Sequence, residues 1–369
     1  MKKFLAGLLW CMAMVQAGIC GNALAPAKID AIFAGFKLND APGAGVVVIK
    51  EGKKVFQQGY GVAEIRTRAK IDEHTNFRLA SVSKQFTAMA VMLLVRDGKL
   101  RYEDRLAQIF PNFAPYGNSI TVRNLLNHTS GLLDYEDLMP RPYGNDAQGN
   151  LKQIQDREVL DLLKKQARTK FAPGSHWAYS NSGYVVLGQI VEKVSGQPFG
   201  NFLRDRIFSP LGMDHTIAYQ RGKNDVPNRA YGYSKEHFRW NQTDQSPTSA
   251  TLGDGGIYSS LSDLAKWDAA LQHHTLLSES EMQPAITPVQ VPGVQEPSGK
   301  PAAYGFGWFL NPYNGHRRMW HYGETVGFRT TIQRFPDDNL TIIVLCNRTD
   351  VVPKNLALKV ADLFLRQDR

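Results

Sequence analysis

The pattern of apolar and polar residues changes twice along this chain of 369 residues. Near the start, the short strand-like runs 44–50 and 53–60 flank the turn Glu51–Gly52, which predicts two paired strands. Near the end, strand-like runs return. They cover residues 304–310, 317–322, 328–335 and 340–347. The Pro336–Asn339 tetrapeptide between the last two runs predicts a hairpin turn.

Between these ends the pattern is mainly helical. Residues 85–95 form a broadly apolar run of helix-forming side chains that ends near Asp97–Gly98, where a glycine can cap the C-terminus of a helix. Further helical runs cover residues 121–126, 156–165, 182–195, 262–272 and, close to the end of the chain, 353–366. The segments 139–150 and 242–256 are rich in Gly, Pro and Asn and predict loops, and a Pro-rich stretch covers 284–301.

A sheet made from both ends of the chain explains this order of elements most simply. We therefore predict an α/β (α+β) fold with a central antiparallel sheet, flanked by the terminal helices and carrying a mostly helical inserted region. Residues 26–369 form a single domain in this interpretation. Its α/β part is made by residues 26–80 and 285–369, and its mostly helical part by residues 81–284.

The first 25 residues have the three parts of a secretory signal peptide, namely two lysines, an apolar run and a small-residue end. Ala23–Ala25 is a plausible cleavage signature, although Pro26 follows it and a cut after Cys20 or Ala23 is an alternative. We therefore predict export across the inner membrane to the periplasm. A lipoprotein anchored at Cys20 ranks lower because the bulky Ile19 precedes it. An uncleaved anchor also ranks lower, because the apolar run is short for a membrane span.

The net charge bears on the possible partners of the chain, and the cysteine content bears on its disulfides. The formal net charge of +9 falls to +7 once Lys2 and Lys3 leave with the signal peptide. No dense run of Lys and Arg accompanies this excess, so we predict no nucleic-acid partner. Cys11 and Cys20 lie in the predicted signal, and Cys346 lies in an apolar run where its side chain should face the core. The mature chain is then expected to lack a disulfide.

The candidate chemistry begins at Ser81-Val82-Ser83-Lys84, where a helix is predicted to start. Residues three apart on a helix share a face, so the Lys84 amine can reach the Ser81 hydroxyl. A desolvated lysine can activate a serine nucleophile, and the N–H groups of a helix start favour a developing oxyanion. Taken alone, the same four residues more commonly mean an N-cap serine beside a solvated lysine.

Two later clusters supply groups that such a site needs. The segment Tyr179–Asn181 precedes a predicted helix, and its phenol could shuttle protons while its amide binds a substrate carbonyl. The segment His321–Gly323 lies at a strand end, where a glycine allows close approach and a histidine adds a titratable group. Each cluster alone also fits a structural role, as a core aromatic beside a capping Asn or as a hairpin with a structural histidine.

Together the three motifs resemble the serine penicillin-recognising enzymes, in the branch of class C β-lactamases, D-alanyl-D-alanine carboxypeptidases and family VIII esterases. The motifs occur in family order, and the segments Asn127–Leu132 and Gly255–Ser260 also match. The resemblance covers residues 30–365, approximately. It implies the β-lactamase/transpeptidase-like fold and a hydrolase without cofactor or metal. It also implies a small-molecule or peptide substrate, such as a peptidoglycan-type peptide, an ester or a β-lactam.

The resemblance also implies a role for each site residue. Ser81 would attack the substrate carbonyl and become acylated, while Lys84 and Tyr179 would share the general-base and general-acid work. The oxyanion hole would use backbone N–H groups. The residues implied in substrate binding are Asn181, His321, Gly323 and, through its backbone N–H, Glu324.

The departure from the family pattern lies at His321, because class C β-lactamases usually carry Lys-Thr-Gly at this place. A histidine would give a weaker, pH-dependent positive charge for a substrate carboxylate. We therefore predict an exported serine hydrolase similar to a D-alanyl-D-alanine carboxypeptidase or a carboxylesterase. The alternatives are a class C-like β-lactamase and a penicillin-binding sensor or interaction module that is acylated without turnover. The sequence leaves the natural substrate and the oligomeric state open.

Two other histidine positions have simpler interpretations. His128 is expected to hydrogen-bond the backbone near the cleft. The pair His273–His274 has no carboxylate or cysteine at metal-ligand spacing, so we predict no metal site there.

Overall fold

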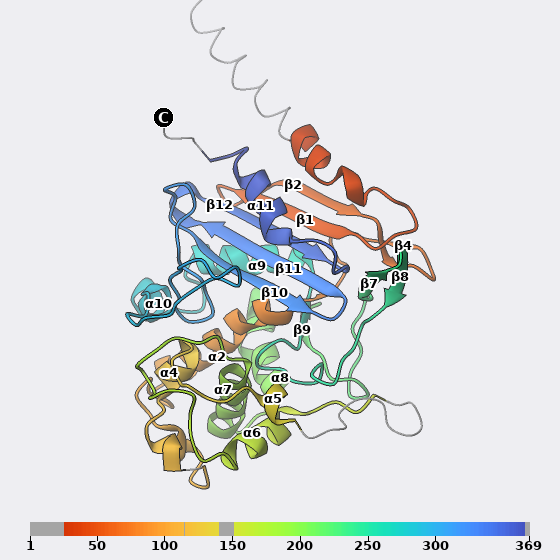
Figure 1. Ribbon diagram of the computed structural model, residues 1–369. Helices are drawn as coiled ribbons and strands as arrows, with labels where there is room; N and C mark the ends of the chain where they lie inside the picture. Colours follow the sequence, from red (N-terminus) through yellow and green to blue (C-terminus); the bar gives the residue numbers. More distant parts are fainter. Residues whose placement is uncertain (1–25, 114, 140–150, 366–369) are drawn as a thin grey trace, which may run out of the picture.

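A five-stranded antiparallel sheet organises the computed structural model, which describes residues 26–113, 115–139 and 151–365 (Figure 1). Its strand order is β10-β11-β12-β1-β2. The strands are β1 (Ala44–Lys50), β2 (Lys53–Tyr60), β10 (Met319–Thr325), β11 (Phe328–Phe335) and β12 (Leu340–Cys346). The first two come from one end of the chain and the last three from the other, and β1 pairs with β12 at the join. The prediction of a sheet built from both ends is therefore confirmed.

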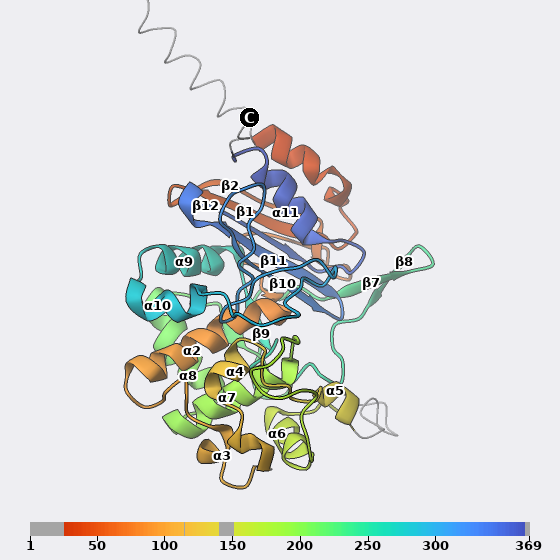
Figure 2. The ribbon, with the colours of Figure 1, turned by 60° about the vertical axis from the view of Figure 1, so that its left-hand side comes forward.

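Helices cover both faces of this sheet, which explains why its central strands are apolar on both sides. The helical residues 26–32 and helix α11 (Pro353–Ala361) lie on one face (Figure 2). Helix α9 (Leu261–Gln272) packs on the other face against β1 and β12. The sequence pattern placed α9 in the inserted part, but it belongs to the sheet layers. Cys346 lies buried on the α11 side, as predicted.

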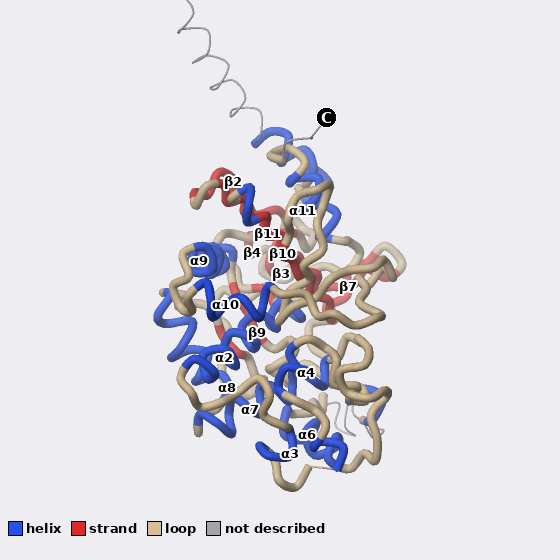
Figure 3. Tube along the Cα trace, turned by 90° about the vertical axis from the view of Figure 1, so that its left-hand side faces the viewer, coloured by secondary structure: helices blue, strands red, loops and turns tan. Residues whose placement is uncertain are grey.

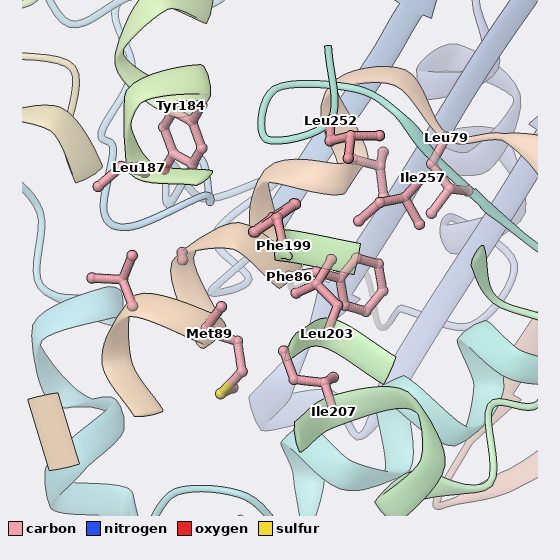
Figure 4. Packing of buried hydrophobic residues seen from close by; sticks show 14 of the residues in the cluster. Leu79, Phe86, Met89, Tyr184, Leu187, Phe199, Leu203, Ile207, Leu252 and Ile257 are labelled. Atoms are coloured by element: carbon pink, nitrogen blue, oxygen red, sulfur yellow. The ribbon is translucent and has the colours of Figure 1, made fainter. Parts of the chain in front are cut away.

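The second half of the molecule is helical and lies below the sheet layers (Figures 1 and 3). Its central element is α2 (Lys84–Arg96), in which every side chain from Lys84 to Leu94 is buried. The helices around it are α3 (Leu106–Ile109), α4 (Val122–Leu126), α5 (Tyr135–Leu138), α6 (Asp156–Lys164), α7 (Asn181–Ser195), α8 (Phe199–Leu203) and α10 (Glu279–Ile286). Figure 4 shows Phe86 and Met89 of α2 in the resulting core.

Several short strands escape the sequence pattern because two to four residues are too few to show alternation. The strands β5 (Phe77–Arg78), β9 (Ile257–Ser259) and β6 (Ile217–Ala218) form a small sheet in that order. Two further pairs are β3 (Val62–Glu64) with β4 (Ala69–Lys70), and β7 (Tyr233–Glu236) with β8 (Arg239–Gln242). The β7–β8 hairpin projects from the body of the molecule (Figure 2).

The predicted strand 304–310 is wrong. The chain turns back on itself there, because the Gly305 N–H donates to the carbonyl of Trp308 and Gly307 adopts a φ of +75°. Isolated bridges between Tyr304 and Phe309, and between Phe309 and Trp320, remain. The predicted strand 317–322 lies two to three residues later as β10, and the predicted helix 353–366 ends at Ala361.

Two sequence predictions fall largely or wholly outside the described residues. They are the signal peptide at 1–25 and the loop at 139–150. Within the described ranges, no helix combines the length and the apolar character needed to cross a membrane.

The core around α2 gives a test of the fold. Phe86 is fully buried, with ring centroids 4.7 Å from Trp267 and 5.4 Å from Phe208. We expect Phe86→Ala to lower the free energy of unfolding by about 3–5 kcal/mol, because it removes apolar contacts and leaves a cavity. Phe238 is 93% exposed, so Phe238→Ala should change the free energy of unfolding by less than about 0.5 kcal/mol. Urea unfolding curves measure both, and equal effects would contradict this packing.

Candidate active site

The structure brings the three sequence motifs into one cluster. Ser81 lies in the 3₁₀ turn η2 (Ala80–Ser83) that leads into α2, and Lys84 is the first residue of α2. The Lys84 Nζ lies 3.0 Å from the Ser81 Oγ and 4.9 Å from the centroid of the Tyr179 ring. The rings of Tyr179 and His321, on β10, have centroids 6.2 Å apart. Residues from three distant parts of the sequence therefore surround the Ser81 hydroxyl.

The turn that carries Ser81 is held in a strained conformation. Ala80 has a φ of +49°, which is unfavourable for a residue with a Cβ and recurs at functional sites. The short strand β9 holds this turn through two hydrogen bonds. The Leu79 N–H donates to the Ile257 carbonyl, and the Ile257 N–H donates to the Ser83 hydroxyl. Ser81 is partly exposed although its neighbours on both sides are buried. The nucleophile candidate therefore faces solvent on a fixed support.

The hydrogen bonds of Lys84 orient its amine. Its Nζ donates to the Asn181 Oδ1 and to the backbone carbonyl of Asp254, both at 2.9 Å, and lies 3.0 Å from the Ser81 Oγ. The two carbonyl oxygens can only accept hydrogen bonds. When the amine is neutral, its two hydrogens must therefore stay on Asn181 and Asp254. Its lone pair then points at the Ser81 hydroxyl, which is the geometry a general base requires.

Burial also changes the protonation of this amine. Lys84 is fully buried, and this lowers its pKa to about 8, although the carboxylates of Asp254, Asp134 and Glu136 act in the opposite direction. Part of the Lys84 population is thus neutral near neutral pH. Burial raises the pKa of Tyr179 well above its ordinary value, so Tyr179 stays a neutral phenol that can donate a proton.

The Tyr179 hydroxyl is a second candidate for proton transfer. It is buried beside Ser81, yet it makes no hydrogen bond of normal geometry within the described part of the chain. A buried hydroxyl without a partner is unusual and often marks a functional position. This phenol could hydrogen-bond an atom of the substrate.

The structure corrects the expected charge of His321. Its side chain is fully buried, its Nδ1 lies 2.7 Å from the Tyr322 carbonyl, and its Nε2 lies 3.2 Å from the Tyr304 hydroxyl. Burial, helped by the charge of Lys84, lowers the pKa of His321 to about 3. The imidazole is therefore neutral at physiological pH. The prediction of a pH-dependent positive charge is wrong, because the sequence does not show that this ring is buried beside Lys84.

The two residues after Tyr322 have separable functions. A Cβ on Gly323 would lie 2.0 Å from the Leu79 carbonyl oxygen, so a glycine is needed for β10 to pack against η2. The next residue on β10 is Glu324, and its side chain forms an ion pair with Arg329 at 2.9 Å. The predicted oxyanion hole uses the backbone N–H of Glu324, beside that of Ser81, and not the Glu324 side chain, which is engaged with Arg329.

Two residues that the sequence reasoning missed complete the cluster. Asp254 supplies the carbonyl acceptor for Lys84, whereas its sequence predicted only that it lies in the loop 242–256. Tyr304 lies between His128 and His321, with its hydroxyl 3.1 and 3.2 Å from their Nε2 atoms. Its position in a run taken for a strand gave no such signal. His128 itself bonds the backbone, as predicted: its Nδ1 accepts from the Ser180 N–H at 3.2 Å.

Comparison with known proteins identifies the family. The profile described as Beta-lactamase matches residues 29–365, which is most of the chain. The chain belongs to the beta-lactamase family. Its similarity to penicillin-binding protein 4* of Bacillus subtilis (strain 168) is 34% identity over 337 residues, covering 87% of this chain and 72% of that protein.

Two further similar proteins have names that refer to amino-acid derivatives. The D-aminopeptidase of Brucella anthropi is 31% identical over 83% of this chain and 56% of its own length. The crystal structure of the D-amino acid amidase from Ochrobactrum anthropi SV3, complexed with L-phenylalanine amide, is 25% identical with a TM-score of 0.75. That match covers 91% of this chain and 97% of the amidase. The chain is a serine hydrolase of this family, with the α/β fold of its structural neighbours.

The lowered pKa of Lys84 predicts a pH dependence for this hydrolase. If the neutral amine acts as the general base, kcat/KM for an ester should rise about tenfold per pH unit below the Lys84 pKa and level off above it. We expect a midpoint near the value of about 8 that burial imposes on Lys84. Asp254→Asn keeps the backbone carbonyl but removes a charge that favours the ammonium, so its midpoint should lie at lower pH. A flat profile between pH 6 and 9 would contradict the role of Lys84.

Proposed function

We propose that this chain forms an acyl-enzyme on Ser81 with esters and amides whose leaving group carries no carboxylate. Amino-acid amides and simple esters belong to this class. Water then hydrolyses the acyl-enzyme. Of the two predicted activities, this one is closer to a carboxylesterase than to a D-alanyl-D-alanine carboxypeptidase, whose substrate ends in a carboxylate. The single observation that carries the proposal is the neutral, fully hydrogen-bonded imidazole of His321.

The proton transfers follow from the hydrogen bonds around Lys84. The neutral amine takes the Ser81 proton as Ser81 Oγ bonds to the substrate carbonyl carbon, and the carbonyl oxygen becomes an oxyanion. The backbone N–H groups of Ser81 and Glu324 stabilise that oxyanion in this proposal. Collapse breaks the bond to the leaving group, which receives a proton from the Tyr179 hydroxyl, and the Lys84 ammonium returns a proton to Tyr179. Asn181 holds both the Lys84 amine and the substrate.

The charges near the cluster support a substrate without a carboxylate at this end. Neither nitrogen of His321 is free, since both have hydrogen-bond partners. The nearby cation Arg329 is paired with Glu324, and its Nη1 donates to the carbonyls of Thr325 and Phe328. The carboxylates of Asp134 and Glu136 act on Lys84 through space, so the field at the site also opposes an anion. A substrate with a free ammonium group would be favoured.

The relatives support the same class. An amino-acid amide presents a neutral carboxamide in place of a terminal carboxylate, and the amidase structure contains such a molecule by its title. The D-aminopeptidase relative is likewise named for action at an amino terminus.

We also propose that the chain is exported to the periplasm, on the strength of the signal-like sequence at 1–25. Cell fractionation followed by N-terminal sequencing of the exported protein tests this. A cytoplasmic protein that retains Met1 or Lys2 at its N-terminus would contradict it.

A substitution of the nucleophile tests the mechanism. Ser81→Ala should lose roughly 10³-fold or more of kcat for a p-nitrophenyl ester while keeping the thermal unfolding midpoint of the wild type. The exposed Ser119 supplies the matched control, and Ser119→Ala should keep full activity. Lys84→Ala and Tyr179→Phe should both fail to be acylated by a fluorescent penicillin or an ester. Full esterase activity in Ser81→Ala would overturn the proposal.

A matched pair of esters tests the substrate class. The phenylacetyl esters of glycolamide and of glycolate differ only at the end of the leaving group, which is a neutral carboxamide in the first and a carboxylate in the second. We expect kcat/KM to be at least roughly tenfold higher for the glycolamide ester, because His321 is neutral and Arg329 is already paired with Glu324, so neither offers a free positive charge to the glycolate. Equal rates, or a preference for glycolate, would contradict the proposal. Efficient turnover of nitrocefin in parallel would favour the β-lactamase alternative, and a burst without turnover would favour the sensor.

A further inference from the structure

A continuous row of buried hydrogen bonds crosses from one motif of the site to another. The Ser180 N–H donates to the Nδ1 of His128 at 3.2 Å, and the Nε2 of His128 lies 3.1 Å from the Tyr304 hydroxyl. That hydroxyl lies 3.2 Å from the Nε2 of His321, whose Nδ1 lies 2.7 Å from the Tyr322 carbonyl. The row thus joins the loop that carries Tyr179 to strand β10.

The two ends of this row determine which atom carries each hydrogen between them. A backbone N–H can only donate and a backbone carbonyl can only accept. His128 must therefore accept at Nδ1 and carry its proton on Nε2, from which it donates to the Tyr304 oxygen. His321 must carry its proton on Nδ1 to reach the Tyr322 carbonyl. Its unprotonated Nε2 then accepts from Tyr304, so all the bonds run in one direction.

Reversing this order is costly. A proton on the Nε2 of His321 would face the Tyr304 hydroxyl hydrogen, so that hydrogen would have to leave its acceptor. It cannot turn to the Nε2 of His128, because that nitrogen is already protonated while the Ser180 N–H occupies Nδ1. The Tyr184 hydroxyl also neighbours Tyr304, but it donates to the Leu126 carbonyl and no hydrogen bond of normal geometry joins the two tyrosines. His128, Tyr304 and His321 are all fully buried, and no water-exposed route relieves the conflict. A buried polar group left without its partner costs about 1–3 kcal/mol.

We propose that Tyr304, oriented by His128, is a positioning residue that occupies the Nε2 of His321 and so keeps His321 from binding a substrate carboxylate. This inference rests on the proposed function and extends it, since it names what sets the preference for uncharged leaving groups. Neither residue touches substrate in this proposal. Both act through His321.

The surroundings of His321 agree with this assignment. Titratable groups face it from every element packed around it: Lys84 from α2, His128 from the turn after α4, Tyr179 from the loop before α7, Tyr304 from the 304–310 turn and Tyr322 from β10. Among these, Lys84 alone bears a formal charge at neutral pH, and its positive charge opposes protonation of the ring. Burial lowers the pKa of His128 as well.

Histidine-selective ¹⁵N NMR on the full chain tests the row directly. His321 is assigned by the resonance lost in His321→Gln. In the wild type we expect it to be neutral, protonated on Nδ1, and without a titration above about pH 5. Tyr304→Phe removes one oxygen and leaves Nε2 free, and His128→Asn lets the Tyr304 hydroxyl reverse. Both changes should move the titration of His321 to higher pH.

Tyr116→Phe is the matched control, because it removes a hydroxyl that bonds the Leu163 carbonyl outside the row. It should leave His321 unchanged. A wild-type His321 that is charged at pH 7 or protonated on Nε2 would overturn the proposal, without reliance on any variant. So would a titration that stays the same in Tyr304→Phe.

The glycolamide and glycolate esters supply the functional readout. At about pH 5.5 the preference for the glycolamide ester should narrow by at least roughly threefold in Tyr304→Phe, and stay unchanged in Tyr116→Phe. A purely structural role would slow both esters equally and keep the ratio, which would overturn the proposal. If the wild type hydrolyses neither ester, the proposed function fails, while the NMR titration still decides the role of Tyr304.

Discussion

The burial of the Lys84 amine is the constraint on which the rest of the site depends. An ammonium removed from water costs several kcal/mol unless its hydrogens are bonded, and Lys84 finds acceptors on η2, on α7 and on the segment before β9. That last segment is itself held, because the Asp156 carboxylate accepts from the Leu252 N–H and the Gly253 carbonyl accepts from Thr87. The surrounding fold therefore aligns the amine before any substrate arrives.

The two halves of the molecule contribute different properties to the site. The helical half supplies the proposed nucleophile, Ser81, and the Lys84 amine, whose pKa burial has lowered to about 8. The sheet supplies β10, which packs closely against the turn η2 that carries Ser81, because Gly323 has no side chain to meet the Leu79 carbonyl. His128 and Tyr304 connect these halves by buried hydrogen bonds. The basic Lys84 amine thus lies beside the neutral His321 ring, and the proposed preference for leaving groups without a carboxylate rests on this arrangement.

Local sequence patterns predicted the elements that are long and regular. Strands β1, β2 and β11 lie where their apolar runs indicated, and α2 follows Ser81 as its helix-forming residues predicted. The turn at 304–310 was missed because Gly305 and Gly307 bend a run whose composition suits a strand. The strands β5, β6 and β9 were missed because tertiary contacts, and not their own patterns, create them. α9 was placed with the wrong half, since an apolar helix face does not say which partner it covers.

The sequence by itself determined which chemical groups the site contains and the local spacing of Ser81 and Lys84, because one helical turn fixes that spacing wherever the helix lies. It also indicated Tyr179, Asn181 and His321 through their motifs. The tertiary structure decided their protonation. Lys84 has a lowered pKa, Tyr179 a raised one, and His321 carries no charge. Protonation depends on burial and on partners such as the Asp254 carbonyl and the Tyr304 hydroxyl, which distant segments bring into place through folding.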